Sequence, residues 1–246
     1  VVIGNQTDDA LGVVRRVADR LPAPSFVLGE DFTALEEHGR FVYQDENGLL
    51  DLTPPKLAGR HQIENAAVAI CALRQTGATF RVREPAIERG LKSVEWPARL
   101  QRLVRGPLVD MAPPGAEVWL DGGHNPHGAQ AIARAIADFE ECAPKPLYLI
   151  CGMLKTKDAT GFLTAFRGLA RHVATLTIPD EDAALGAGAL YDAARASGLD
   201  ASPADDLEDA MMQVVAWSRA REGVGPPRVL ICGSLYLAGQ VLAANS

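Results

Sequence analysis

The sequence predicts an α/β protein whose C-terminal part is Rossmann-like, a mostly parallel sheet with helices on both faces. Two observations carry this prediction. Between residues 118 and 232, short apolar segments alternate with segments of helical periodicity, and three of the apolar segments end in turns that contain glycine. Such alternation is typical of parallel sheets covered by helices. Ligands bind such sheets at the carboxyl ends of the strands.

The sequence of the first part of the chain predicts short strands and helices. We expect strands at residues 1–4, 25–28, 40–45 and 49–53, and helices at 7–21, 61–76 and 85–91. Asn5 or Thr7 is suited to cap the first helix. The turn Glu46-Asn47-Gly48 joins two alternating segments, which indicates a β-hairpin, and Gly77 supplies a left-handed stop after the long helix.

The segment Val94–Ala98 has no periodicity and separates two parts of the chain. Pro97 disfavours helix at Trp96, because its ring clashes with the preceding residue in the helical conformation. We therefore expect two domains, residues 1–94 and residues 95–246.

Beyond this boundary the alternation becomes regular. We expect strands at residues 118–120, 147–151, 173–178 and 229–232, and helices at 129–139, 161–170, 189–196 and 207–220.

Composition and charge exclude several classes of protein. Apolar residues make up 48% of the 246 residues, as in ordinary globular proteins, and 24 Lys and Arg against 31 Asp and Glu leave a net charge of −7. No basic surface for nucleic acid is expected, and no apolar run approaches the ~20 residues of a membrane span. Without paired cysteines or a signal sequence, we expect a cytoplasmic protein. Because the opening Val1–Gly4 has the composition of a strand in mid-fold, we also expect a fragment.

The turn after the strand at 118–120 concentrates polar groups. Gly122 and Gly123 allow close approach of the backbone to a ligand, and Asp121, His124 and Asn125 offer an acceptor, a titratable group and an amide. One interpretation is a ligand site. The other is a tight strand-to-helix turn in which Asn125 is the cap.

Three further features leave alternatives open. His124 and His127 have the spacing of a metal-binding pair, but no third ligand is evident, so we expect no metal ligands in this chain. Lys157 and Asp158 follow the next glycine turn and either reach a ligand or begin a solvated helix. No phosphate-binding loop GxxxxGK[ST] is present, and the chain holds no complete catalytic set.

Five segments in order resemble the folylpolyglutamate synthase/dihydrofolate synthase branch of the Mur ligase superfamily. They are Gly59–Ala67, Trp96–Gln101, Leu120–Ala129, Gly152–Asp158 and Gly233–Tyr236. Two departures are mild: Ala98 stands where that family usually has glycine, and Gly123 where it usually has alanine. Neither removes a functional group.

The resemblance implies a division of labour between domains. Residues 1–94 would be the C-terminal part of a Mur-ligase-type ATPase domain, and residues 95–246 the complete C-terminal domain. The phosphate loop and the magnesium ligands would lie upstream of Val1, so the isolated chain is expected to be inactive.

The resemblance also implies the chemistry and its residues. ATP, with Mg²⁺, would phosphorylate a carboxylate of dihydropteroate or a reduced folate, and the amine of L-glutamate would attack the acyl phosphate. Asn65 would bind adenine, Arg99 the phosphates and Asp121 the ribose, with His124 beside them. The resemblance further suggests that Lys157, Asp158 and Ser234 serve the substrate or domain closure. We expect a monomer.

Two other functions stay open on the sequence alone. A Mur-type peptidoglycan ligase shares the architecture and energetics but differs in motifs at the linker and the first turn. A non-enzymatic Rossmann-like binding module is the second, although Asn65 and Asp121 on different domains favour a shared ligand.

Overall fold

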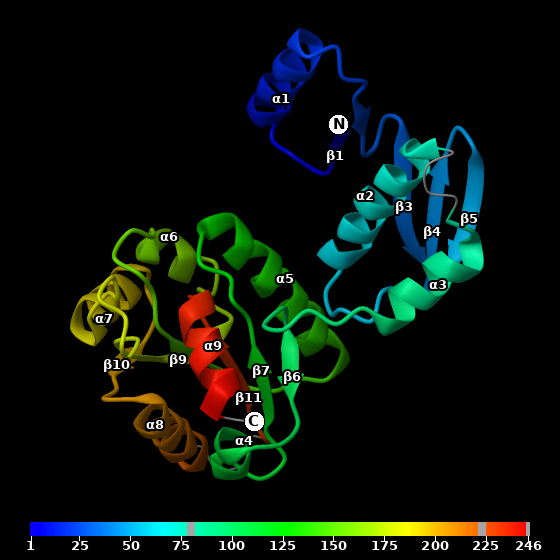
Figure 1. The fold of residues 1–246 in the computed structure, drawn as a ribbon. Coiled ribbons are helices and arrows are strands. Elements are labelled where there is room, and N and C mark those ends of the chain that lie inside the picture. Colours follow the sequence, from blue (N-terminus) through cyan, green and yellow to red (C-terminus); the bar gives the residue numbers. More distant parts are fainter. Residues whose placement is uncertain (78–81, 221–224, 245–246) are drawn as a thin grey trace. The chain divides into compact units, whose positions relative to one another are not determined.

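The computed structural model describes residues 1–77, 82–220 and 225–244 of the chain. The chain divides into two compact units, Val1–Glu95 and Trp96–Ser246 (Figure 1). The division lies within the segment 94–98, where the sequence places the domain boundary.

In its described residues, 1–77 and 82–95, the first unit combines two small sheets with three helices. In chain order its elements are β1 (Val2–Ile3), α1 (Asp8–Arg20), β2 (Phe26–Val27), β3 (Phe32–Glu37), β4 (Arg40–Asp45), β5 (Gly48–Leu52), α2 (His61–Gln75) and α3 (Glu84–Ser93). β1 and β2 pair in parallel, whereas β3, β4 and β5 form an antiparallel sheet.

The core of the first unit lies between the three-stranded sheet and helices α2 and α3. Phe32, Phe41 and Tyr43 from the sheet pack with Ile63 of α2 and Ile87 of α3 in one buried cluster. Burying an aromatic or branched side chain stabilises a fold by about 1.5–3 kcal/mol, so this small unit has a core of its own.

Helix α1 begins where the sequence indicates, because Thr7 accepts a hydrogen bond from the Ala10 amide at 3.4 Å. Ala18 of this helix is buried, but Val13, Val17 and Leu21 are exposed. These three residues lie at i, i+4 and i+8, so they form an apolar stripe on one side of the helix. Gly77 has φ of +56°, as a left-handed stop after α2 requires.

Strand β3 is the element of this unit that sequence reasoning missed. Only Phe32 is buried in it, and Leu35 is exposed, so the strand lacks the alternation that marks a half-buried strand. Its place is set by pairing with β4 along its whole length.

The second unit is built around one six-stranded sheet. Its elements are β6 (Gln101–Leu103), α4 (Pro107–Met111), β7 (Glu117–Leu120), α5 (Pro126–Cys142), β8 (Leu147–Cys151), α6 (Ala159–Thr164), β9 (Ala170–Thr175), α7 (Ala187–Ala196), β10 (Ala201–Pro203), α8 (Leu207–Arg219), β11 (Arg228–Cys232) and α9 (Leu235–Ala244). The strand order is β10-β9-β8-β11-β7-β6, and only β6 runs antiparallel to its neighbour. The predicted α/β fold with a mostly parallel sheet is confirmed.

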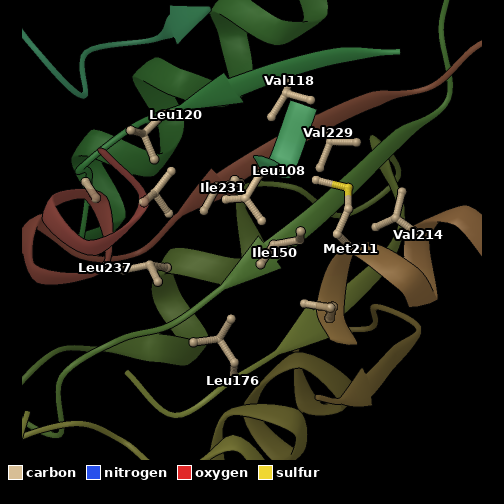
Figure 2. Packing of buried hydrophobic residues seen from close by; sticks show 14 of the residues in the cluster. Leu108, Val118, Leu120, Ile150, Leu176, Met211, Val214, Val229, Ile231 and Leu237 are labelled. Atoms are coloured by element: carbon tan, nitrogen blue, oxygen red, sulfur yellow. The ribbon is translucent and has the colours of Figure 1, made fainter. Parts of the chain in front are cut away.

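Helices cover both faces of this sheet. On one face, side chains of β7, β8 and β11 pack with α4, α8 and α9, as Figure 2 shows for Val118, Ile150 and Ile231 with Leu108, Met211 and Leu237. On the opposite face, Trp119 of β7 contacts Phe139 of α5, with ring centroids 4.9 Å apart. Successive residues of a strand point to opposite faces, which explains why Val118 and Trp119, adjacent in the sequence, pack against different helices.

Several boundaries differ from the sequence prediction. Helix α6 ends at Thr164 and not at residue 170, because the chain turns at Gly168 with φ of +78° and β9 begins at Ala170. The short elements α4, β6 and β10 carry too few residues for a periodic signal. Helix α9 lacks a polar face that would have marked it.

Candidate functional site at the carboxyl edge of the sheet

Three glycine-bearing turns meet at the carboxyl edge of the six-stranded sheet. They follow β7, β8 and β11, which are adjacent and parallel in the order β8-β11-β7. The Gly233 amide donates to the Gly123 carbonyl at 3.1 Å, and the Gly152 amide donates to the Cys232 carbonyl at 3.3 Å. The turns therefore hold one another through their backbones.

One of these glycines is required by the geometry. Gly233 has φ of +108°, and a Cβ there would lie 2.6 Å from the Gly152 carbonyl oxygen. A larger residue at position 233 would therefore push the turns after β8 and β11 apart. A Cβ on Gly122 would lie 2.3 Å from Cδ2 of Leu235, an exposed side chain that can rotate away.

Asp121 follows β7 directly and is 3% exposed. Its Oδ1 accepts from the Gly123 amide at 2.6 Å, and its Oδ2 accepts from the Leu100 amide at 2.8 Å. The carboxylate thus binds its own turn and, at the same time, the segment that enters the second unit. The structure shows this backbone role directly, and contact of Asp121 with a ribose stays a prediction.

Arg99 lies in that entering segment, between two buried residues, Ala98 and Leu100. Its own side chain is exposed and has no hydrogen bond or ion pair within the part of the chain that the structure describes. The Ala98 carbonyl accepts from the Gly122 amide at 2.8 Å, which places Arg99 next to the first turn. Arg99 and Asp121 are therefore brought together.

His124 is half-buried in the same turn, and its Nδ1 lies 3.0 Å from the Gly122 carbonyl. A carbonyl only accepts, so Nδ1 carries the hydrogen. Asn125 accepts from the Gly128 amide at 2.8 Å and caps α5. The capping interpretation of Asn125 is thus confirmed, and Asp121 and His124 make the remaining polar groups of the turn.

The turn after β8 contains Lys157 and Asp158. Asp158 accepts from the Gly161 amide at 2.8 Å and caps α6, as the alternative interpretation expects. Lys157 is half-buried, and its amide donates to the Leu154 carbonyl at 3.1 Å. Neither observation tests a substrate role for these two residues.

Ser234 follows β11 and is 2% exposed. Its Oγ accepts from the Tyr236 amide at 3.1 Å at the start of α9. The hydroxyl oxygen therefore stabilises a helix start, and its role toward a substrate stays a prediction.

Asn65 belongs to the first unit, on the exposed side of α2. Its side-chain amide donates to Gln62 Oε1 at 3.1 Å. Figure 1 shows α2 against the sheet β3-β4-β5. Its predicted contact with adenine stays a prediction.

Two buried cysteines lie beneath the turns. Cys151 and Cys232 are directly opposite each other on the neighbouring strands β8 and β11. A hydrogen bond with Cys151 and burial raise the pKa of the Cys232 thiol well above its usual range. A neutral buried thiol is a poor nucleophile, so Cys232 serves packing.

Metal binding receives no support from clustering of side chains. Within residues 1–77, 82–220 and 225–244, no group of three or more His, Cys, Asp or Glu side chains is arranged to hold a metal ion. His124 and His127 therefore lack a third partner in the described part of the chain.

A charged groove in the first unit contains none of the predicted site residues. It is lined by Arg40, Thr53, Glu84, Pro85, Glu88, Arg89 and Lys92. Its central carboxylate is already engaged, because hydrogen bonds from Thr53 hold the pKa of Glu88 at about 2. These hydrogen bonds join α3 to the residue that follows β5, and they engage both carboxylate oxygens of Glu88.

Gln101 is the residue at this edge that sequence reasoning missed. Its Oε1 accepts from the Ala98 amide at 2.9 Å. Nothing in the local pattern distinguishes this glutamine, although a glycine expected at position 98 was a signal that the segment turns sharply, and Ala98 indeed has φ of +56°.

The chain matches known proteins over most of its length. Residues 105–235 match the family described as Mur ligase, glutamate ligase domain. The chain is 32% identical to a probable bifunctional folylpolyglutamate synthase/dihydropteroate synthase of Halobacterium salinarum and 27% identical to the folylpolyglutamate synthase of Lacticaseibacillus casei. These alignments cover 95% and 98% of this chain but 27% and 53% of those proteins.

A solved structure agrees with these matches. The folylpolyglutamate synthase of Mycobacterium tuberculosis, crystallised with ADP and AMPPCP, is similar with a TM-score of 0.80 and 25% identity. The likeness covers 98% of this chain and 54% of that protein. The chain thus spans about half the length of two of these proteins and about a quarter of the third. No helix in the described residues has the length and apolar character that a bilayer span needs.

Proposed function

The chain belongs to the Mur ligase family, in its folylpolyglutamate synthase/dihydrofolate synthase branch, and from this premise we propose that it carries part of an ATP-dependent glutamate ligase. The substrates would be L-glutamate and the carboxylate of dihydropteroate or a reduced folate. The enzyme would be a cytoplasmic monomer.

The reaction has two balanced steps. The carboxylate attacks the γ-phosphorus of ATP, which gives an acyl phosphate and ADP. The amine of glutamate then attacks the acyl carbon, the amide bond forms, and inorganic phosphate leaves with the electrons of the broken C–O bond and takes up the proton that the nitrogen loses. Mg²⁺ would neutralise charge on the phosphates when bound, and no residue of this chain is assigned as its ligand.

The observation that carries the proposal is the state of Arg99. It is a cation without a protein partner among the described residues, and its segment is bonded to the first of three glycine turns at the sheet edge where ligands bind. A guanidinium in such a place can donate paired hydrogen bonds to phosphate oxygens.

Neighbouring residues would complete the nucleotide site. His124 would use Nε2 toward the nucleotide, since its Nδ1 is engaged with Gly122, and Asp121 shapes the turn. From the first unit, Asn65 would contact adenine. Lys157, Asp158 and Ser234 would act on the glutamate side or in closure.

The direct test is phosphate release that depends on an amino acid. The gene product that carries these residues is incubated with ATP and L-glutamate, and with dihydropteroate, a reduced folate or a UDP-muramyl substrate. We expect release with one or both pterin substrates only. Release with the muramyl substrate alone would make the protein a peptidoglycan ligase, and nucleotide binding without turnover would make it a binding module.

Arg99→Ala tests the site within the active protein. Loss of a phosphate-facing guanidinium costs about 2–4 kcal/mol, so kcat/KM for ATP should fall by roughly 30- to 900-fold. Arg102→Ala removes an exposed arginine three residues away and serves as the control. Equal kinetics in the two variants would remove Arg99 from the site. The 246-residue chain by itself should incorporate no glutamate.

A further inference from the structure

We propose that Gln62 is a positioning residue that sets the preference for adenine over guanine, because it holds the side-chain amide of Asn65 in one orientation. The inference deepens the proposed function and rests on it, since it takes Asn65 as the group that contacts the base. It concerns Gln62 and its neighbour His61, to which the family resemblance gives no role.

The first observation is a chain of three polar side chains at the start of α2. Gln62 and Asn65 are three residues apart, so their side chains are neighbours on the helix surface. The Asn65 Nδ2 donates to Gln62 Oε1 at 3.1 Å, and the Gln62 Nε2 lies 3.0 Å from Nε2 of His61. The hydrogen bonds therefore run without a break from Asn65 through Gln62 to His61.

The second observation is that this chain has a direction. An amide nitrogen only donates, so Nε2 of His61 accepts and carries no hydrogen. Gln62 is 5% exposed, and both ends of its amide are engaged. Turning the Gln62 amide over would break both bonds and would leave buried polar atoms unpaired, which is costly. The Gln62 oxygen is thus held toward Asn65.

The third observation concerns what Asn65 has left to offer a ligand. Its side chain is exposed, and one hydrogen of Nδ2 is committed to Gln62. The bond to Gln62 is the one side-chain hydrogen bond of Asn65 within residues 1–77, 82–220 and 225–244. Asn65 therefore keeps one N–H donor and the acceptor Oδ1 for a base.

A donor beside an acceptor distinguishes the two purines. Adenine presents the N6 donor next to the N7 acceptor, which matches Oδ1 and the remaining N–H of Asn65. Guanine presents O6 and N7, which are both acceptors, so one of them would face Oδ1. An Asn65 amide released from Gln62 could turn and direct its hydrogens to guanine. The bond to Gln62 removes that option.

A double-mutant cycle on two nucleotides tests this role. Four forms of the gene product that carries these residues are compared: the natural protein, Gln62→Met, Asn65→Ala and the double variant. Calorimetry measures the affinity of each for ATP and for GTP. Gln75→Met, which changes an exposed glutamine at the other end of α2, is the control and should keep the natural ratio of affinities.

We expect Gln62→Met to reduce the ratio of ATP affinity to GTP affinity by about 10-fold when Asn65 is present, and by less than about twofold when Asn65 is alanine. A loss of packing alone would weaken both nucleotides alike and would leave the ratio unchanged. An unchanged ratio in Gln62→Met would therefore overturn the inference, and so would an equal fall in both backgrounds.

The Asn65→Ala arm separates this inference from the proposed function. Asn65→Ala should weaken ATP binding by about 10-fold, because it removes a bidentate contact with the base. If it does so while Gln62→Met keeps the ratio, only the positioning role is wrong. If Asn65→Ala leaves ATP affinity unchanged, the adenine contact of the proposed function is wrong, and the positioning role is refuted with it.

Gln62→Glu provides a test by rescue. The glutamate keeps the length of the side chain and an acceptor for Asn65 Nδ2, and His61 can place a hydrogen on Nε2 to face the carboxylate. The preference for ATP should therefore return to within about twofold of the natural ratio. This variant keeps the test open if Gln62→Met does not fold, and loss of the preference in Gln62→Glu would contradict the positioning of Asn65 by an acceptor at position 62.

Discussion

The two ends of the six-stranded sheet use charge in opposite ways. At the amino end, Arg228 opens β11 and is 1% exposed. Its guanidinium binds Glu117 at 3.1 Å, Glu140 at 3.2 Å and the Ala143 carbonyl at 3.3 Å. Lys145 adds a second cation 3.3 Å from Glu117. Each of these four charged side chains therefore has an ion-pair partner.

At the carboxyl end, Asp121 and Arg99 do not form an ion pair with each other. Asp121 lies close to Arg99 in the fold, yet its oxygens bind backbone amides, and Arg99 keeps no partner among the described residues. Desolvating a charge is costly unless it is paired. Burial therefore marks the charges used for structure, whereas an exposed cation on a backbone held by hydrogen bonds stays available to an anionic ligand.

The largest expected effect contrasts two arginines. Arg228→Met leaves Glu117 and Glu140 without their buried partner, so the free energy of unfolding should fall by about 3–5 kcal/mol. Arg99→Met, an exposed substitution of the same kind, should change it by less than about 0.5 kcal/mol. Denaturant unfolding of both variants measures this. Comparable losses would show that the two ends do not differ as described.

The next effect contrasts two glycines at the carboxyl end. Gly233→Ala places a methyl group 2.6 Å from a backbone oxygen at φ of +108°, so we expect a loss of about 2–4 kcal/mol in stability. Gly239→Ala lies six residues on in α9, where a Cβ meets nothing within 4 Å, and should stabilise the protein by about 0.5–1 kcal/mol. Thermal melts decide between them. A tolerated alanine at position 233 would mean that the turns need no close backbone contact.

A pH dependence follows from the amino end. Burial by itself would raise the pKa of Glu117, but hydrogen bonds from Trp119 and Arg228 and the charges of Arg228 and Lys145 outweigh it and lower the pKa. Its contribution is therefore complete above the unfolded value of about 4.3 and is lost as the pH falls through the lower folded value.

Unfolding free energies between pH 6 and pH 3 test this sign. Glu117→Gln should be less stable at pH 6 and should lose less stability on acidification than the natural protein. The matched control is Glu141→Gln, an exposed carboxylate of α5, which should keep the natural slope. A natural slope in Glu117→Gln would contradict the lowered pKa.

The smallest expected effect is at Ala98. Glycine there would remove the cost of φ at +56°, but it would also lose a buried methyl group and loosen the unfolded chain. These terms nearly cancel, so Ala98→Gly should change stability by less than about 1 kcal/mol. Ala98→Val should cost more than about 2 kcal/mol, because a β-branched residue tolerates positive φ poorly. Equilibrium unfolding measures both, and a stable valine variant would show that the backbone at residues 98–100 relaxes.

The fold class and the meeting of the three glycine turns could be predicted from the sequence. Alternation along residues 118–232 predicted the parallel sheet, and the carboxyl ends of parallel strands lie at one edge, which brings the three turns together. Capping residues such as Thr7 and Asn125 were also readable, because a cap and the amide it binds lie within three residues.

The partner of each polar group, in contrast, depends on the tertiary structure. Asp121 and the Leu100 amide are 21 residues apart, and Arg228 meets Glu117 across 111 residues. No local periodicity records such pairs, because strand order and register set them. For the same reason β3 could not be predicted, because its place depends on pairing with β4. Gln101 could not be predicted either, because its side-chain oxygen matters only where Ala98 adopts a left-handed conformation.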